Sequence, residues 1–399
     1  MSARHDFFCS CPQGLESVLA EELGEIAQMS NSLQVLSQVP GGVHCQGRLE
    51  DAWLMNLHSR IASRVLLRVA HGTYHTESDL YDLAFSTQWQ KWFTTERTIR
   101  IDVSAIKSPV KSTNFIALKI KDAVADRFRH HFGVRPSVDT KSPDIPVTAH
   151  LSGNSATLYL DTSGEPLFKR GWRSLTGEAP IRENLAAGIL RMAGWKPGVT
   201  LYDPMCGSGT ILAEAAQMLS GIAPGVNREF AFEKLNGFDP QKWASMKKTS
   251  APLSLPAEPT LFGSDISIRS VEITRSNLES AGIRMEVPVR QMDAQKMLPP
   301  TDKPGILVTN PPYGERLGMR PNQNRTGDEA VALFYDTLGS TLKSHFAGWR
   351  IFLFTADRDV PRLLRLKESR KTPLYNGAIE CRLFRFDMTA GSNRKKPST

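Results

Sequence analysis

The stretch Leu201-Tyr202-Asp203-Pro204-Met205-Cys206-Gly207-Ser208-Gly209-Thr210 is a glycine-rich turn between a predicted strand and a predicted helix. Glycine lets the backbone approach a ligand closely, and the free N–H groups of a helix start suit a carboxylate or a phosphate. A nucleoside triphosphate loop needs a lysine where Ile211 follows, and a dinucleotide loop needs a small residue where Leu212 stands. The turn therefore predicts a ligand site and weakens both phosphate interpretations.

Beyond this turn, strands alternate with helices, which is the pattern of a parallel sheet. The expected strands are residues 199–202, 261–264, 286–291, 305–309 and 350–355. Two β-type runs then flank Asn376-Gly377, a strong hairpin signal, so the sheet is expected to end in an antiparallel pair. An insert lies between Gly221 and Pro259, and its second half is expected to be a flexible loop.

Acidic residues follow the second and third of these strands. Asp265 can accept hydrogen bonds from both hydroxyls of a ribose, and Asp293 can accept one from an adenine amino group. Either aspartate alone is more often a solvated helix cap. Together with the glycine-rich turn, however, three successive strand ends offer groups that suit a nucleoside cofactor.

The fourth strand ends in Asn310-Pro311-Pro312-Tyr313, which by itself could be only a turn. Next to a cofactor site it predicts a catalytic loop. Asn310 and the carbonyl of Pro311 would accept the two hydrogens of an exocyclic amine, while Tyr313 would stack on the unpaired base. The amine itself attacks the methyl group, so Cys206 is interpreted as a small loop residue and not as a nucleophile.

The first half predicts an α+β arrangement, with strands near residues 6–11, 98–106, 147–151 and 156–161 and helices near residues 14–23, 51–63 and 116–131. Cationic side chains that could contact RNA phosphates gather in and near the last of these helices. They are Lys107, Lys111, Lys119, Lys121 and Arg127, with Arg173 and Arg316 elsewhere in the chain. The alternative is a solvated helix face opposite an apolar stripe.

The composition is that of a soluble globular protein with several domains, at 40% hydrophobic residues and 399 residues in length. A formal charge of +8 favours a polyanionic partner. Five scattered cysteines without a C-x-x-C pair fit a reduced cytoplasm, and no metal site is expected from Cys9-Ser10-Cys11. The absence of a long apolar run predicts neither export nor membrane insertion.

The order of these motifs resembles class I methyltransferases that use S-adenosylmethionine, with an Asn-Pro-Pro-Tyr motif of enzymes that methylate exocyclic or amide nitrogens. This resemblance implies Asn310, Pro311 and Tyr313 as catalytic residues. It implies as cofactor-binding residues Asp203, Met205, Cys206, Gly207, Ser208, Gly209, Thr210, Asp265, Ile266, Asp293 and Ala294. The implied fold class is α/β, a Rossmann-like sheet with an antiparallel C-terminal hairpin.

Further motifs resemble the ferredoxin-like and THUMP modules of RNA-modifying enzymes. Among them are Ser59-Arg60-Ile61-Ala62-Ser63-Arg64, Leu160-Asp161-Thr162-Ser163-Gly164, Arg170-Gly171-Trp172-Arg173 and Ala179-Pro180-Ile181-Arg182-Glu183-Asn184. The whole chain resembles guanine-N2 methyltransferases of large-subunit ribosomal RNA, most closely the N-terminal half of bacterial enzymes that methylate guanine 2445 of 23S rRNA.

This resemblance implies a ferredoxin-like region at 1–65, a THUMP domain at 66–164 and a methyltransferase domain at 165–399 with a basic tail at 391–399. It implies 23S rRNA or a large-subunit precursor as partner. The sequence ends after the hairpin, so the second activity of those enzymes, N7-methylation, is expected to be absent.

Four alternatives remain open. THUMP modules also accompany enzymes that make N2-methylguanine in tRNA. Adenine-N6 DNA methyltransferases share Asn-Pro-Pro-Tyr, but they would need a target-recognition domain. Glutamine methyltransferases of release factors share it too, but they would not need a basic N-terminal half. A non-catalytic RNA-binding module is disfavoured by the intact motif residues Asp203, Gly207, Gly209, Asp265 and Asn310.

Overall fold

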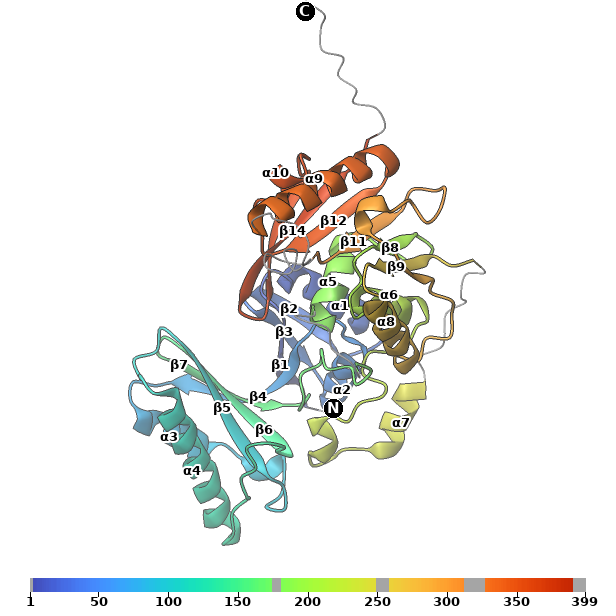
Figure 1. Ribbon diagram of the computed structural model, residues 1–399. Helices are drawn as coiled ribbons and strands as arrows, with labels where there is room; N and C mark the ends of the chain where they lie inside the picture. Colours follow the sequence, from blue (N-terminus) through green and yellow to red (C-terminus); the bar gives the residue numbers. More distant parts are fainter. Residues whose placement is uncertain (1–2, 174–180, 249–257, 312–326, 390–399) are drawn as a thin grey trace, which may run out of the picture. The chain divides into compact units, whose positions relative to one another are not determined.

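The computed structural model describes residues 3–173, 181–248, 258–311 and 327–389 and divides the chain into two compact units (Figure 1). The first unit combines Met1–Cys11, Leu19–Arg170 and Pro224–Ser250. The second combines Pro12–Val18, Gly171–Ala223 and Ala251–Thr399. The boundaries of the two units therefore differ from the predicted domain boundaries. Part of the predicted methyltransferase region belongs to the first unit, and a short piece of the N-terminal region belongs to the second.

The first unit contains one seven-stranded sheet in the order β2-β3-β1-β4-β7-β6-β5. All neighbouring strands pair antiparallel except β5 and β6, which are parallel. The strands are β1 (His5–Ser10), β2 (Gln34–Val39), β3 (Gly42–Gly47), β4 (Arg64–Thr73), β5 (Ile99–Ile106), β6 (Ile145–Ser152) and β7 (Ser155–Asp161). The predicted strands of this half are all present.

Strand β4 was not anticipated from the sequence, and it joins two halves of this sheet. Its first four residues pair with β1, and its remaining length pairs with β7 from Leu66↔Asp161 to Thr73↔Ser155. The boundary expected between residues 65 and 66 therefore falls inside a continuous strand. A run of only ten residues with irregular alternation gives no clear period-2 signal, which is why sequence periodicity did not reveal it.

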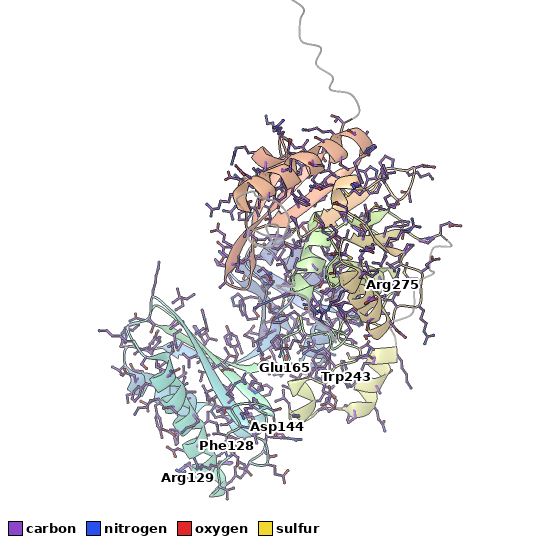
Figure 2. The ribbon with its side chains drawn as sticks, in the orientation of Figure 1. Phe128, Arg129, Asp144, Glu165, Trp243 and Arg275 are labelled. Carbon is purple, nitrogen blue, oxygen red and sulfur yellow. The ribbon has the colours of Figure 1, made fainter. Side chains whose placement is uncertain are left out.

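The helices of the first unit are α2 (Leu49–His58), α3 (Glu77–Ser86) and α4 (Thr113–Phe132), together with most of α1 (Glu16–Ala27). Thr76 caps α3 by accepting from the backbone N–H of Asp79, and Gly133 ends α4 in a left-handed conformation. The inner stripe of α4 is apolar and buried, and it includes Phe128, which is labelled in Figure 2.

The first half of the insert folds onto the first unit. Phe232 stacks on Trp53 of α2 with ring centroids 5.6 Å apart, and Trp243 of α7 (Pro240–Lys248) meets Phe232 edge-on at 5.0 Å (Figure 2). Lys234 of the 3₁₀ turn η2 (Ala231–Lys234) forms an ion pair of 2.7 Å with Asp144. These rings provide an apolar anchor, while the predicted loop at residues 249–256 lies outside the described residues.

The second unit contains a seven-stranded sheet in the order β10-β9-β8-β11-β12-β14-β13. The strands are β8 (Leu201–Asp203), β9 (Leu261–Asp265), β10 (Val289–Gln291), β11 (Ile306–Thr309), β12 (Arg350–Thr355), β13 (Arg370–Asn376) and β14 (Ile379–Asp387). The first five are parallel and the last two form the antiparallel hairpin. This confirms the predicted α/β fold class.

Helices α5 (Glu183–Met192), α6 (Thr210–Leu219) and α8 (Ile268–Ser280) pack in sequence, with α6 contacting both others. Helix α9 (Gly327–His345) contacts α10 (Val360–Leu363). The core beneath α9 is apolar and includes Leu307 of β11, Leu338 and Leu342 of α9, Ile351 of β12 and Phe384 of β14. Burying each of these side chains contributes about 1.5–3 kcal/mol to the stability of the fold, and the packed core holds the strand ends in place.

No helix within the described residues is long and apolar enough to cross a membrane.

Candidate active site

The glycine-rich turn connects β8 to α6 and depends on two glycines in the left-handed region, Gly207 at φ 57° and Gly209 at φ 77°. A side chain at Gly209 would have its Cβ 2.6 Å from Cγ2 of Thr274, whereas a Cβ at Gly207 would meet nothing within 4 Å. Gly209 is therefore required both by its backbone conformation and by the space around it.

Helix α8 and strand β9 hold this turn from outside. The Thr274 hydroxyl donates to the carbonyl of Gly207 at 3.0 Å, and the Asn277 amide donates to the carbonyl of Ser208 at 2.9 Å. The N–H of Cys206 donates to the carbonyl of Ser264 at 3.0 Å. Thr274 and Asn277 are fully buried polar residues three positions apart on one helix face, and sequence reasoning missed them. That spacing on an otherwise amphipathic helix was the available signal.

Leu212 takes the place of the third glycine of a dinucleotide loop, and the structure shows how it fits. A Cβ on Gly263 of β9 would lie 2.5 Å from Cδ1 of Leu212. The missing side chain on the strand therefore makes room for the leucine on the helix. This packing supports the sequence argument against a dinucleotide turn, because close approach of strand and helix is achieved by a different glycine.

Asp203 ends β8 and is 2% exposed. It accepts a hydrogen bond of 2.7 Å from the hydroxyl of Thr309 and one of 3.3 Å from the N–H of Met205. Burial raises its pKa to about 7, assisted by the nearby charge of Asp265, while the two hydrogen bonds oppose the rise. Thr309 directly precedes Asn310, so this bond links the cofactor turn to the start of the predicted catalytic loop.

Asp265 stands at the end of β9 and lies beside the turn, as the sequence predicted. Its Oδ2 accepts from the N–H of Gly207 at 3.0 Å, and its Oδ1 accepts from the N–H of Ser267 at 2.9 Å. Each carboxylate oxygen has a second lone pair, so two ribose hydroxyls can still be accepted. The next residue, Ile266, is 48% exposed, an apolar side chain at the same strand end.

Asp293 caps the 3₁₀ turn η3 (Ala294–Lys296) by accepting from the N–H of Gln295 at 3.0 Å. The chain enters this turn through a hydrogen bond of 2.9 Å from the N–H of Met292 to the carbonyl of Asp265. Asp293 is therefore a cap of this turn. The bond from Met292 brings Asp293 and the buried Ala294 next to the end of β9. A contact from Asp293 to an adenine stays a prediction.

Asn310 follows β11 and is half-buried, and Pro311 is buried. Strand β11 lies directly beside β8, with Ile306 opposite Leu201 and Leu307 opposite Tyr202. Neighbouring strands lie about 4.8 Å apart, so Asn310 emerges next to the cofactor turn at the carboxyl edge of the sheet. The predicted residues Pro312, Tyr313 and Arg316 lie outside the described residues.

Cys206 is 7% exposed and its sulfur lies 3.5 Å from the Thr274 hydroxyl oxygen. Burial raises the pKa of the Cys206 thiol well above its usual value, with the charge of Asp203 as a second cause. A thiol that stays protonated is a poor nucleophile. The structure thus fits the interpretation of Cys206 as a small loop residue.

Arg173, predicted as an RNA contact, is engaged inside the second unit. Its guanidinium lies 3.0 Å from Glu183, donates to the Thr210 hydroxyl at 2.9 Å, and donates to the carbonyl of Ile181 at 3.0 Å. Its side chain is 14% exposed. These contacts give Arg173 a structural role at the start of α6, where it orients the residue that follows Gly209.

The other predicted RNA contacts within the described residues lie in the first unit and do not share one face. Lys107 and Lys111 are exposed in the segment before α4. Lys119 lies over the ring of Phe115, Lys121 pairs with Asp122 at 2.7 Å, and Arg127 lies over Phe85 of α3. At about 100° per residue, Lys119 and Lys121 point to opposite sides of the helix. The cations therefore do not form one face of the helix, while the apolar stripe is present, and their contact with RNA stays a prediction.

No group of three His, Cys, Asp or Glu residues that could hold a metal ion occurs in the part of the chain that the structure describes.

Comparisons with known proteins support a methyltransferase. Residues 170–385 match the RMKL-like methyltransferase domain, residues 74–161 match the THUMP domain, and residues 6–66 match the RlmL ferredoxin-like domain. The ribosomal RNA large subunit methyltransferase K/L of Psychromonas ingrahamii is 40% identical over 94% of this chain and 49% of its own length. The chain spans about half the length of the curated relatives it matches.

Two solved structures share the fold over almost the full length. A possible methylase from Clostridium difficile 630 superposes with a TM-score of 0.85 at 28% identity, over 100% of both chains. SMU.472, described as a candidate methyltransferase and complexed with SAH, superposes with a TM-score of 0.83 at 29% identity, over 98% of this chain and 100% of its own. With its domain match over more than half of the sequence, this chain belongs to the RMKL-like methyltransferase domain family.

Proposed function

We propose that this protein transfers a methyl group from S-adenosylmethionine to the exocyclic N2 amine of a guanine in large-subunit ribosomal RNA. The observation that carries the chemistry is the position of Asn310 beside the cofactor turn, one strand away and linked to it through the Thr309–Asp203 hydrogen bond. Transfer of a methyl group needs the acceptor nitrogen and the donor held close and in line, and the neighbouring positions of β8 and β11 support this arrangement.

The methyl donor is S-adenosylmethionine, since the family is one of methyltransferases and its neighbour SMU.472 was solved with SAH. The α6 N-terminus and the N–H groups of the turn would bind the carboxylate of its methionine moiety. Asp265 would accept from the ribose, with Ile266 against the adenine and Asp293 at the adenine amino group. Met205, Cys206, Ser208, Thr210 and Ala294 complete the proposed lining of this site.

Asn310 and the carbonyl of Pro311 would accept the two hydrogens of the guanine amine. Its lone pair is delocalised into the ring, so two acceptors that fix the hydrogens turn the lone pair toward the methyl group and stabilise the positive charge that develops. Pro311 supplies its carbonyl from a stiff, buried backbone. Tyr313 would stack on the extruded base.

The RNA class is supported by the relatives and by the THUMP match. The relatives carry the name ribosomal RNA large subunit methyltransferase K/L, and the formal charge of +8 suits a polyanionic substrate. We propose residues 1–65, 66–164 and 165–399 as the ferredoxin-like, THUMP and catalytic domains, although β4 passes through the first boundary. Lys107, Lys111 and Lys119 are the proposed phosphate contacts of the THUMP domain, and an rRNA substrate implies the cytoplasm.

The test uses rRNA and tRNA purified from a strain that lacks this protein, incubated with the purified full chain and isotope-labelled S-adenosylmethionine. Nucleoside mass spectrometry should find labelled N2-methylguanosine in large-subunit rRNA. Label in tRNA alone would overturn the rRNA assignment in favour of the tRNA alternative. Labelled N6-methyladenosine would overturn the choice of base.

The same assay tests the role of Asn310. Asn310→Ala should lower the transfer rate by a factor of about 10²–10³, the loss typical of one removed charge-stabilising group. Calorimetry with S-adenosylmethionine provides the control, because the affinity for the cofactor should change little. A variant that retains turnover would exclude Asn310 from the catalytic role.

A further inference from the structure

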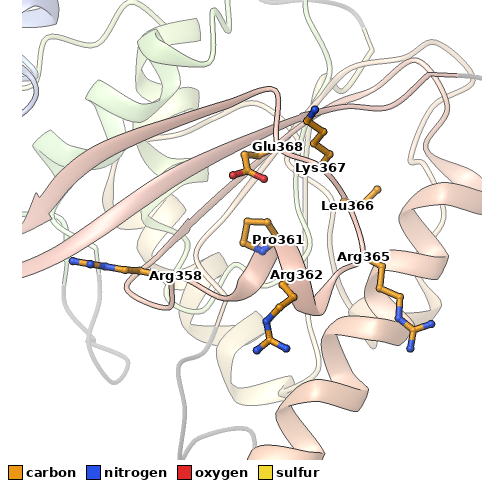
Figure 3. Close-up of a pocket in the computed structure, with 7 residues that line it drawn as sticks. All are labelled: Arg358, Pro361, Arg362, Arg365, Leu366, Lys367 and Glu368. Carbon is orange, nitrogen blue, oxygen red and sulfur yellow. The ribbon is translucent and has the colours of Figure 1, made fainter.

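A basic pocket of about 520 Å³ lies in the second unit between the end of β12 and the start of β13 (Figure 3). It is lined by Arg358, Pro361, Arg362, Arg365, Leu366, Lys367 and Glu368. Four of these seven side chains are cationic and one is acidic. We call it the 358–368 pocket. None of the motifs that define the cofactor turn or the catalytic loop contributes to it.

The surrounding segment is enriched in positive charge. Residues 357–371 contain six Lys or Arg and three Asp or Glu, so the segment carries a formal charge of +3, whereas the full chain of 399 residues carries +8. Figure 3 shows the guanidinium groups of Arg362 and Arg365 extending to the same side of the pocket. A concentration of like charge on a short exposed segment lowers stability slightly through self-repulsion, and a polyanion would relieve this repulsion.

Within the part of the chain that the structure describes, the arginines of this pocket pair with exposed carboxylates. Arg358 pairs with Glu380 at 3.1 Å, Arg362 with Asp359 at 3.4 Å and Arg365 with Asp336 at 3.0 Å, and the three arginine side chains are 70%, 74% and 75% exposed. Such surface pairs are weak and screened by salt. A guanidinium has five donors, so a phosphate can bind without first breaking a strong internal contact.

The position of Arg365 in the pocket is fixed by the end of α10. Arg365 ends the α10 segment at φ 52°, in the left-handed region that favours glycine. The preceding residue, Leu364, packs closely against α9. A Cβ on Gly339 of α9 would lie only 2.1 Å from the carbonyl oxygen of Leu364. This conformation terminates the helix, since the N–H of Leu366 donates to the carbonyl of Pro361 at 3.2 Å and the N–H of Arg365 donates to the carbonyl of Arg362 at 3.1 Å. Lys107, one of the proposed RNA contacts, is the other non-glycine residue with positive φ in the described chain.

The pocket begins at the edge of the sheet that carries the proposed catalytic residue and extends from there toward β13, whose first residue, Arg370, is level with Phe352 of β12. Strands β11 and β12 are parallel neighbours, with Thr309 opposite Leu353. Asn310 therefore emerges beside Phe354, and the chain reaches Arg358 four residues later. Both lie at the carboxyl ends of adjacent strands, within one unit. A nucleic acid whose target base enters at Asn310 would pass its neighbouring phosphates over this segment.

We propose that the 358–368 pocket binds the phosphodiester backbone of the RNA next to the methylated nucleotide. This inference rests on the proposed function, since it names where the substrate of that same site is held. The exposure of the cations favours a polymer over a small anion. A single phosphate bound by exposed side chains gains little, whereas several phosphates of one strand each release counterions on binding.

The experiment compares two full-length variants with equal loss of charge. The pocket variant carries Arg362→Gln, Arg365→Gln and Lys367→Gln. The control variant carries Lys196→Gln, Arg284→Gln and Lys303→Gln, three exposed residues that precede β8, β10 and β11, strands that β12 and β14 separate from β13. The affinity for a short fluorescein-labelled single-stranded RNA is measured by anisotropy at several salt concentrations.

The pocket variant should bind this RNA at least about tenfold more weakly at low salt, and the slope of log K against log salt should fall by about 2, at roughly 0.7 per lost phosphate contact. The control variant should keep the slope of the wild type. In the methylation assay, the pocket variant should show a raised KM for RNA with an unchanged kcat, since the pocket binds substrate and transition state equally. Equal slopes for the two variants would overturn the proposal.

Two further measurements sharpen the result. Glu368→Gln removes the carboxylate that lines the pocket, so it should strengthen RNA binding, about two- to fivefold by removal of one repulsive charge. Arg365→Gly removes a guanidinium, so it should weaken RNA binding. Glycine also favours the left-handed conformation of this position, so the melting temperature should not fall. Weaker RNA binding by Glu368→Gln would argue that Glu368, and not the cations, makes the contact.

Inorganic phosphate, added at constant ionic strength, distinguishes the source of the phosphate group. If it displaces RNA from the wild type at concentrations well below those of the added salt, the pocket is a small-anion site and the RNA assignment is wrong. The failure of the proposed function is a different result: the wild type would then produce no N2-methylguanosine, while the difference between the pocket and control variants in RNA binding would be unaffected.

Discussion

The cofactor turn at residues 204–209 and the 358–368 pocket belong to the same unit, yet they are built in opposite ways. The turn is held by buried hydrogen bonds from Thr274 and Asn277, and a side chain at Gly209 has no room. The three arginines that line the pocket are 70–75% exposed and, among the described residues, pair with exposed carboxylates.

This difference follows from what each region would bind. A small cofactor must be held in one orientation, so its site requires fixed backbone donors. An RNA strand can be held by many weak and similar charge contacts, and such contacts tolerate movement. Substitutions in the turn are therefore expected to affect stability and cofactor binding strongly, while substitutions in the pocket should affect only RNA binding.

The largest effect is expected from Gly209→Ala. The new Cβ would clash with Thr274 and distort the turn, so the affinity for S-adenosylmethionine should fall by about a hundredfold, as a displacement near 1 Å can cause. Calorimetry measures the affinity. Gly207→Ala is the matched control, because it has the same left-handed strain of about 1–2 kcal/mol but open space around the Cβ.

A second variant identifies the clash itself. Thr274→Ser removes the methyl group that lies nearest to the Cβ of an alanine at position 209, and it keeps the hydroxyl that binds Gly207. Added to Gly209→Ala, it should restore part of the affinity. Identical affinities for Gly209→Ala and Gly207→Ala would contradict the role of the helix in shaping the turn.

Asn277→Ala should come next, with a loss of about 1–3 kcal/mol in the free energy of unfolding, because the buried carbonyl of Ser208 loses its donor. Urea unfolding of the second unit measures it. Glu279→Ala, an exposed residue on the same helix, should change stability by no more than about 0.5 kcal/mol. A comparable loss in both variants would assign the effect to the helix and not to the contact with the turn.

The pH dependence of stability tests the buried carboxyl of Asp203. Its pKa is raised from its ordinary value of 3.8 to about 7, so the folded state holds a proton that the unfolded state releases. The stabilisation is full below the unfolded pKa and is lost as the pH rises through about 7, which means that stability falls between about pH 4 and pH 7. Asp203→Asn should flatten this fall in urea unfolding measured from pH 5 to pH 8. A variant with the wild-type pH profile would place the titration elsewhere.

The smallest effect is expected from Arg362→Gln in the pocket. The pair with Asp359 is exposed, so the free energy of unfolding should change by less than about 0.5 kcal/mol. Thermal and urea unfolding in the absence of RNA provide the measurement. A loss above about 1 kcal/mol, as expected for the turn, would mean that the pocket is part of the structural framework and would remove the contrast between the two regions.

Much of the second unit could be predicted from the sequence. Strand β12 occupies the predicted residues 350–355, and β11 begins one residue later than expected, because long buried runs bounded by turn residues give a clear signal. The ends of β8 and β9 carry Asp203 and Asp265 as expected. The local chain therefore contains enough information to place each motif at a strand end.

Other features needed information from distant residues. Strand β4 is recognisable only from its pairing with β1 and β7, and the aromatic ring of Trp243 finds its partners in Trp53 and Phe232, far away in the chain. The cationic residues near α4 appear as one cluster in the sequence, yet the helix turns them to different sides and gives two of them partners. Periodicity does not report such pairings.

The sequence by itself determined the order of the parallel strands in the second unit, the glycine-rich turn, the acidic strand ends and Asn310 after the fourth strand, because each depends on local backbone and side-chain chemistry. The tertiary structure decided which partners those residues have. The hydrogen bond between Thr309 and Asp203 joins residues 106 positions apart, and Thr274 reaches Gly207 across 67 positions. Such groups come together only when the parallel strands pair side by side, and their spacing in the sequence does not predict the contact.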